Sequence, residues 1–193
     1  LGHGGALRSR SSTVEIHDSR FKENRADKKG GGINSASDGI AIEDCLFEGN
    51  TGIEGGGGAT SWRGDAVVRN SLFRGNRSDE EGGGYSAEGL VSFENNIVVG
   101  NTAPLGAGLY AGTKYVTLSM VNSTISGNNG TGFLSDVSTN LSNTLIAGNT
   151  IDLSGTVTGT HNLIGNGDDQ TGLTNGVDGN IFGTVANPSN PRF

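Results

Sequence analysis

Apolar and polar residues recur along this chain in one frame, which ends each time at an asparagine. An apolar residue stands three and eight positions before each of these asparagines, and ten positions before all except the last. Successive asparagines lie 21 to 27 residues apart, and they are Asn24, Asn50, Asn76, Asn101, Asn128 and Asn149. Such a recurrence of apolar columns identifies a repeat protein.

The apolar columns predict short β-strands. Segments 14–16 and 40–42 alternate apolar and polar side chains, which is the period of a strand. A second strand is expected after each glycine run, as at segments 30–33 and 82–85, and no segment has the period of a helix. Short strands bury such columns by coiling and stacking in parallel. The sequence therefore predicts an all-β fold, a single-stranded parallel β-helix with about six to seven coils.

Two segments are expected along the chain. Residues 1–166 carry the coils, and the first coil is incomplete because Gly4-Gly5-Ala6 matches the middle of a later coil. We therefore expect a fragment or a processed product of a longer chain. Residues 167–193 are rich in Gly, Asn and Asp and contain two prolines, so we expect an irregular segment on the last coil.

Two polar columns accompany the apolar ones. Glycine precedes five of the six frame asparagines, which predicts a turn, and the stacked amides are expected to hydrogen-bond as a ladder. The same structural role is expected for the Asp or Asn that stands six positions earlier: Asp18, Asp44, Asn70, Asn95, Asn122 and Asn143. The alternative for both columns is a polar groove that binds sugar.

Charge and cysteine content limit the classes of partner. The net charge is −7, from 20 acidic and 13 basic residues, which argues against binding to nucleic acid or to an anionic membrane. No stretch is long enough to span a bilayer, so direct membrane insertion is not expected. The single cysteine, Cys45, occupies a column of small residues and is expected to have no redox role.

One outward column carries candidate chemistry. It reads His17, Glu43, Arg69 and Glu94 in four successive frames. If these side chains lie on adjacent strands, they form either a cross-strand ion-pair ladder or an active site. In the second case Glu43 and Glu94 hold Ca²⁺ or neutralise a uronate, and Arg69 acts as the base of a polysaccharide lyase or epimerase.

Other candidate ligand sites are weaker. Asp168 and Asp169 could bind Ca²⁺ through loop oxygens, although a solvated turn is the simpler expectation. The three histidines lie in different coils, so no shared metal site and no cofactor are expected. Trp62 and Tyr85 could stack on a sugar ring, whereas packing against a neighbouring coil is the commoner role of such residues.

The repeat also resembles a known family. Phe21-x-x-Asn24, Phe47-x-x-Asn50 and Phe73-x-x-Asn76, each followed by a Gly-Gly-Gly run, resemble the paired FxxN and GGA[ILV] motifs of polymorphic outer-membrane proteins. More broadly, the chain is similar to bacterial secreted right-handed β-helix proteins, and its tail, 162–193, resembles the end of such a helix in large surface proteins. The resemblance implies a right-handed coil and a passenger or adhesin-like role, and it supplies no catalytic residue.

We therefore expect a non-enzymatic segment on the outer surface of a bacterium or outside the cell. It would act as a rigid stalk, an adhesin-like surface or a self-assembling module. Expected partners are a glycan or cell-surface ligand and a second copy stacked end to end. The alternative is the carbohydrate-active enzyme with the Glu43–Arg69–Glu94 column as its site.

Overall fold

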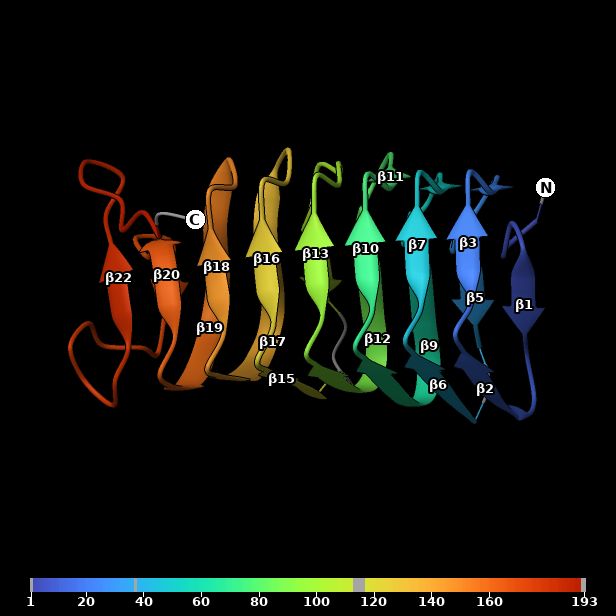
Figure 1. Cartoon of the computed structure of the whole chain (residues 1–193), viewed down its shortest axis with the longest axis horizontal. Coiled ribbons are helices and arrows are strands. Elements are labelled where there is room, and N and C mark those ends of the chain that lie inside the picture. Colours follow the sequence, from blue (N-terminus) through green and yellow to red (C-terminus); the bar gives the residue numbers. More distant parts are fainter. Residues whose placement is uncertain (1, 37, 113–116, 192–193) are drawn as a thin grey trace.

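The computed structural model describes residues 2–36, 38–112 and 117–191, and in these ranges the chain is an all-β solenoid. Successive coils lie side by side along the long axis, and the first and last coils form its two ends (Figure 1). Every strand pair is parallel and joins equivalent positions of neighbouring coils, as between Phe47 and Phe73. The predicted all-β parallel β-helix is confirmed.

Three sheets make the walls of the solenoid. The eight-stranded sheet takes one strand from each coil, in the order β22 (Ile181–Gly183), β20 (Leu163–Asn166), β18 (Leu145–Ala147), β16 (Thr124–Ser126), β13 (Ile97–Val99), β10 (Leu72–Arg74), β7 (Leu46–Glu48) and β3 (Arg20–Lys22). The three-stranded sheet follows the first frame asparagines and contains β11 (Arg77–Ser78), β8 (Thr51–Gly52) and β4 (Arg25–Ala26).

The eleven-stranded sheet forms the opposite, bent wall. Its main path is β1 (Leu7–Ser9), β5 (Ile33–Ser35), β9 (Ala59–Arg69), β12 (Tyr85–Glu94), β14 (Leu109–Ala111), β17 (Thr131–Ser142), β19 (Ile151–Thr160) and β21 (Gln170–Thr171). Off this path, β2 (Thr13–His17) pairs with β6 (Gly39–Glu43), and β15 (Thr117–Val121) pairs with β12 and β17. The long strands thus carry both predicted strand segments of a coil without a break.

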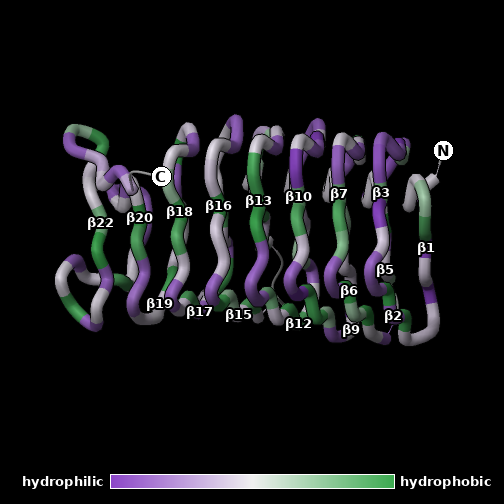
Figure 2. Tube along the Cα trace, in the orientation of Figure 1, coloured by the Kyte–Doolittle hydropathy of each residue, from purple (hydrophilic) through white to green (hydrophobic). Residues whose placement is uncertain are grey.

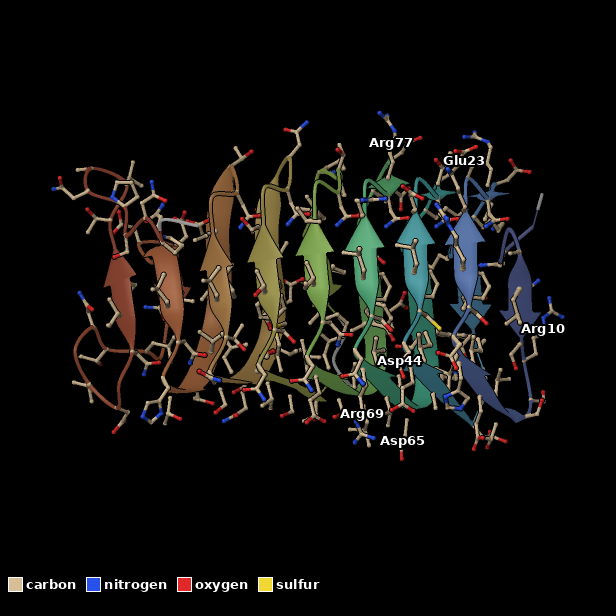
Figure 3. The ribbon with its side chains drawn as sticks, in the orientation of Figure 1. Arg10, Glu23, Asp44, Asp65, Arg69 and Arg77 are labelled. Atoms are coloured by element: carbon tan, nitrogen blue, oxygen red, sulfur yellow. The ribbon has the colours of Figure 1, made fainter. Side chains whose placement is uncertain are left out.

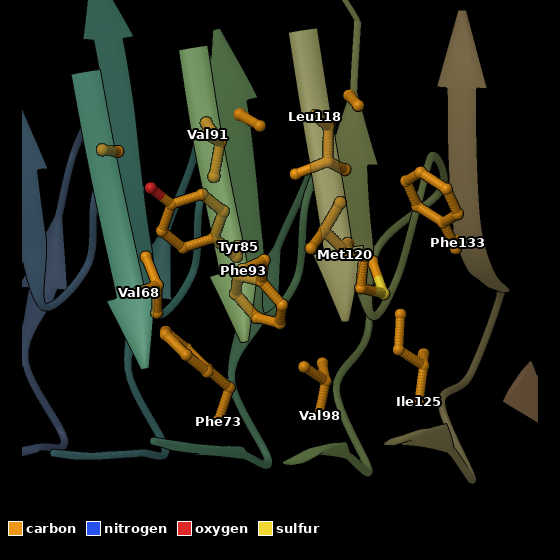
Figure 4. Packing of buried hydrophobic residues seen from close by; sticks show 14 of the residues in the cluster. Val68, Phe73, Tyr85, Val91, Phe93, Val98, Leu118, Met120, Ile125 and Phe133 are labelled. Carbon is orange, nitrogen blue, oxygen red and sulfur yellow. The ribbon is translucent and has the colours of Figure 1, made fainter. Parts of the chain in front are cut away.

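The apolar columns fill the space between the sheets. Phe21, Phe47 and Phe73 stack face to face, with ring centroids 4.9 and 4.6 Å apart. Val98 and Ile125 continue this column, and all of its members from Phe47 to Ile125 are completely buried (Figure 4). Burial of each such side chain contributes about 1.5–3 kcal/mol, so the repeated stacking of one column stabilises every coil in turn.

The turn conformation lies beside the frame asparagines and not on them. The residue before each asparagine has a positive φ, as at Gly75 (61°) and Glu23 (54°), whereas the asparagines themselves do not. Residues of the earlier Asx column also have positive φ, as at Asp44 (53°) and Asn70 (50°). Glycine, Asp and Asn tolerate this left-handed region best, which explains their recurrence at the corners.

The expected irregular segment 167–193 contains further regular structure. Strands β21 and β22 lie within it and pair with β19 and β20, so both large sheets extend beyond residue 166. The apolar residues Ile181 and Phe182 pair with Leu163 and Ile164 as in earlier coils. The first residue of the predicted coil segment and residues 192–193 of the predicted tail lie outside the described ranges.

Candidate functional site

The frame asparagines form one continuous line of hydrogen bonds along the axis. Each Oδ1 accepts two hydrogen bonds from the preceding asparagine, one from its backbone N–H and one from its side-chain amide; for Asn50 and Asn76 these distances are 3.0 and 2.9 Å. The second amide hydrogen of Asn76 goes to the carbonyl of Phe47 at 3.0 Å. The pattern runs through six asparagines, from Asn24 to Asn149, which we call the Asn ladder.

A buried carboxylate ends the Asn ladder. Oδ1 of Asp152 accepts the backbone N–H and the amide of Asn149 at 2.8 and 3.0 Å. Its Oδ2 accepts the backbone N–H of Asn166, in the following coil, at 2.8 Å. All three donors therefore share one carboxyl group as their acceptor, which joins Asn149 to the following coil.

A second internal line runs through the column of Cys45, where the sequence indicated only small residues. The backbone N–H of Cys45 donates to Ser71 Oγ at 3.1 Å, and that of Ser71 donates to Asn96 Oδ1 at 2.9 Å. Further along, Asn162 donates to Asn180 through its backbone N–H and its amide. Ser and Asn are interchangeable here because each places an acceptor oxygen near the backbone N–H of the equivalent residue in the preceding coil. Burial raises the pKa of the Cys45 thiol above its ordinary value.

The earlier Asx column lies outside the core, and its side chains are not a continuous ladder. Two amide contacts join its members in the described residues, Asn95 to Asn70 at 3.3 Å and Asn143 to Asn122 at 2.7 Å. Asp44, from the same column, is exposed. The two predicted polar columns therefore differ: the frame asparagines hold coils together, and the earlier column shapes a corner.

The outward charged column has the predicted register. His17, Glu43, Arg69 and Glu94 are successive partners on β2, β6, β9 and β12. Arg69 Nε donates to Glu94 Oε2 at 3.0 Å, and His17 Nδ1 lies 3.3 Å from Glu43 Oε2. Arg69 projects into solvent at the edge of the solenoid (Figure 3). Exposed pairs of this kind contribute at most about 1 kcal/mol each.

A second outward ion cluster lies on the eight-stranded sheet. Glu48 accepts hydrogen bonds from Arg20 Nη2 at 2.5 Å and from Arg74 Nη2, so one carboxylate joins three consecutive coils. The hydrogen bond from Arg20 and, to a smaller extent, the one from Arg74 lower the pKa of Glu48 to about 2. This cluster and the outward charged column both fix the register of neighbouring strands.

A third ion cluster is partly buried and joins residues two coils apart. Lys29 Nζ lies 2.9 Å from Glu81 Oε1 and 2.5 Å from Glu88 Oε1. Burial on its own lowers the pKa of Lys29, but the hydrogen bonds to Glu88 and Glu81 outweigh that effect, so the pKa lies above its ordinary value. The side chain of Glu88 is 7% exposed. Sequence periodicity missed this contact because Lys29 and Glu81 lie in the variable links between columns.

Asp168 and Asp169, the two residues considered as calcium ligands, form contacts with the backbone of other segments. Asp168 Oδ2 accepts the backbone N–H of Val185 at 2.8 Å, and the carbonyl of Asp169 accepts the N–H of Gly155 at 3.1 Å. Within the ranges that the structure describes, no three His, Cys, Asp or Glu side chains are placed to hold a metal ion. The same ranges contain no helix with the length and apolarity needed to cross a bilayer.

The two aromatic candidates point to opposite sides of the wall. Tyr85 is completely buried and contacts Phe73 and Phe93 in the core, as Figure 4 shows. Trp62 is 41% exposed, and the guanidinium of Arg63 lies over its ring at 4.1 Å. Trp62 is therefore the aromatic side chain of this pair that a ligand can reach.

One comparison with known proteins gives a match. The family described as right-handed beta helix region matches residues 4–182, which is most of the chain. Comparisons with curated proteins and with solved structures gave no match. The matched region begins in the turn before β1 and ends in β22, so it coincides with the stacked coils (Figure 2).

Proposed function

The chain belongs to the right-handed β-helix family, and we propose that it acts as a rigid, non-enzymatic module on the outer surface of a bacterium. The observation that carries this proposal is the Asn ladder. It joins six consecutive coils through hydrogen bonds that are buried in the middle of the ladder and partly buried at its ends, from Asn24 to Asn149, and is continued by Asp152. A solenoid whose coils are tied in this way is suited to hold a surface or a stalk in a fixed shape.

The ion clusters support the same role. Glu48 and Arg69 both pair with charged residues of neighbouring coils, and each contact joins strands of consecutive coils. Their charges are thus used between the coils of the chain itself. Together with the resemblance to polymorphic outer-membrane proteins, this favours a stalk or an adhesin-like passenger on the cell surface.

Location on intact source cells tests the proposal. An antibody against the chain should label intact cells, and protease added outside the cells should remove the signal. Labelling that requires permeabilised cells would overturn the surface role. A cytoplasmic protein examined in the same cells is the control for intact membranes.

Stacking with a second copy belongs to the proposed role. Strands β1 and β22 are terminal strands of their sheets in the described structure. A terminal strand leaves backbone N–H and C=O groups free to pair with a strand of a second copy. The proposal predicts light scattering that rises with protein concentration. Scattering that stays flat into the high micromolar range would overturn end-to-end assembly.

A second candidate function is that of a carbohydrate-active enzyme, either a polysaccharide lyase or an epimerase. The observation that favours it is the placement of Arg69 between Glu43 and Glu94 on three adjacent strands. An arginine flanked by two carboxylates could act on a bound uronate, with Ca²⁺ held by the acids. The ion pair between Arg69 and Glu94 favours the structural role instead, because it occupies the group that would have to act as the base.

A further inference from the structure

A pocket of about 360 Å³ opens on the outer face of the eleven-stranded sheet, away from the outward charged column. Its lining comes from four consecutive strands and from the turns before β1 and β5, and includes His3, Arg8, Lys29, Asn34, Trp62 and Glu88. Arg8 and Asn34 are register partners on β1 and β5, and Trp62 and Glu88 are partners on β9 and β12. Its volume lies within the range of small-molecule sites.

The walls of this pocket are held in place. Lys29 crosses from the turn before β5 to Glu81 and Glu88, two coils away, and holds the Glu88 carboxylate in the lining of the pocket. Arg63 stacks on the indole of Trp62. Because these contacts already restrain Glu88 and Trp62, less side-chain conformational entropy is lost when a ligand binds.

Two polar groups at the pocket, one on His3 and one on Arg8, have no partner among the residues that the structure describes. Nδ1 of His3 is buried and forms no hydrogen bond. Arg8 is exposed, and it belongs to none of the ion pairs formed among the residues that the structure describes. Lys29, by contrast, is already paired with two carboxylates. The guanidinium of Arg8 is thus the cation left to meet an anion, and a planar guanidinium suits a carboxylate because it donates two parallel hydrogen bonds.

We propose that this pocket binds a saccharide unit that carries a carboxylate. In this arrangement Arg8 binds the carboxylate, Trp62 packs against the apolar face of the sugar ring, and Asn34, Glu88 and His3 bind its hydroxyl groups. An aromatic acid without hydroxyls would leave the buried Nδ1 of His3 without a hydrogen-bond partner, which costs affinity. The proposal names the class of ligand that the adhesin-like role would require. It rests on the proposed function only in assuming that the saccharide belongs to a cell surface.

Intrinsic fluorescence tests the proposal directly, because Trp62 is the only tryptophan in the 193 residues. The probes are glucuronate and galacturonate, with glucose and galactose as neutral sugars and benzoate as an acid without hydroxyls. We expect a saturable change with the uronates, and binding at least tenfold weaker for the neutral sugars and for benzoate. No saturable change with either uronate, or equal binding of benzoate, would overturn the proposal.

Matched variants separate the pocket from the rest of the surface. Arg8→Gln should weaken uronate binding at least tenfold, whereas Arg10→Gln, an exposed arginine two residues further along, should leave it unchanged. Trp62→Phe is followed by calorimetry and should also weaken binding. Equal affinity of the wild-type protein and Arg8→Gln would contradict the assignment. Antibody labelling of intact cells does not depend on this pocket. If uronate binding is absent, the proposed surface role is therefore unaffected and is still tested by that labelling.

Discussion

Asn101 Oδ1 accepts both the backbone N–H and the side-chain amide of Asn76, at 2.8 and 3.0 Å, across two neighbouring coils. Asn76 in turn accepts the same two hydrogen bonds from Asn50 and donates to the carbonyl of Phe47. Every polar atom of the Asn76 side chain is thus used in the buried interior. The relationship shows why this column holds asparagine: the side chain must accept from one neighbour and donate to two others.

Asn76→Asp should therefore destabilise the fold. The carboxylate still accepts from Asn50 but can no longer donate to Asn101 Oδ1 or to the Phe47 carbonyl, and it is buried. We expect a loss of about 3 kcal/mol in the free energy of unfolding, measured by urea denaturation. Asn70→Asp is the control: Asn70 is exposed, Asp44 occupies the equivalent position one coil earlier, and stability should change little. An unchanged urea denaturation curve for Asn76→Asp would show that the Asn ladder does not contribute to the stability of the fold.

The glycine runs should tolerate alanine only where the coils leave room. A Cβ on Gly57 would lie 2.4 Å from the carbonyl oxygens of Arg77 and Gly83, so neighbouring coils must move apart. We expect Gly57→Ala to cost about 3 kcal/mol. At Gly39 the nearest atom lies 3.4 Å from the added Cβ, so Gly39→Ala is the control and should leave the thermal midpoint nearly unchanged. Equal midpoints for the two variants would contradict the close packing.

Acid should weaken the contact between Glu48 and its two arginines. The folded pKa of about 2 lies below the ordinary value of 4.5, so this contact stabilises the fold above that value and is lost as pH falls towards 2. In Glu48→Gln, stability should therefore fall less between pH 5 and pH 2 than in the wild-type protein, by urea denaturation at each pH. Glu15→Gln, whose ion-pair contact is to His17, should follow the wild-type profile. Identical profiles for all three proteins would refute this role of Glu48.

Loss of Lys29 should cost more than loss of its neighbour Lys28. Lys29→Met leaves the mostly buried Glu88 carboxylate without its cation, and we expect a loss of about 2 kcal/mol. Lys28 forms an exposed pair with Glu54, so Lys28→Met should cost well under 1 kcal/mol. The second change Glu88→Gln should restore part of the stability of Lys29→Met. If the two lysine variants unfold at the same urea concentration, the partly buried pair of Lys29 and Glu88 contributes no more to stability than the exposed pair of Lys28 and Glu54.

The repeat columns predicted the fold because each coil repeats the same environment. Phe47, Phe73 and Val98 recur at a fixed distance from an asparagine, and this spacing alone places them in one buried column. The register of Glu43, Arg69 and Glu94 followed for the same reason. The sequence is therefore sufficient to assign positions inside the repeat.

Positions outside the repeat could not be assigned in this way. The contact between Lys29 and Glu88 spans 59 residues and depends on how two long side chains lie over an intervening coil. The pocket beside it also needs Trp62 and Arg8, which belong to different coils and to no common apolar column. The second polar line was missed because Ser71, Asn96 and Cys45 share a backbone contact rather than a residue type.

Incubation with uronate polysaccharides tests most directly the central proposal, that this β-helix acts as a non-enzymatic module. The protein is mixed with pectate, alginate and glycosaminoglycans, with and without Ca²⁺, and the absorbance of unsaturated products is followed over time. We predict that no unsaturated product forms with the wild-type protein or with Arg69→Ala. Product formation by the wild-type protein that disappears in Arg69→Ala would contradict the claim and make the Glu43–Arg69–Glu94 column a catalytic site.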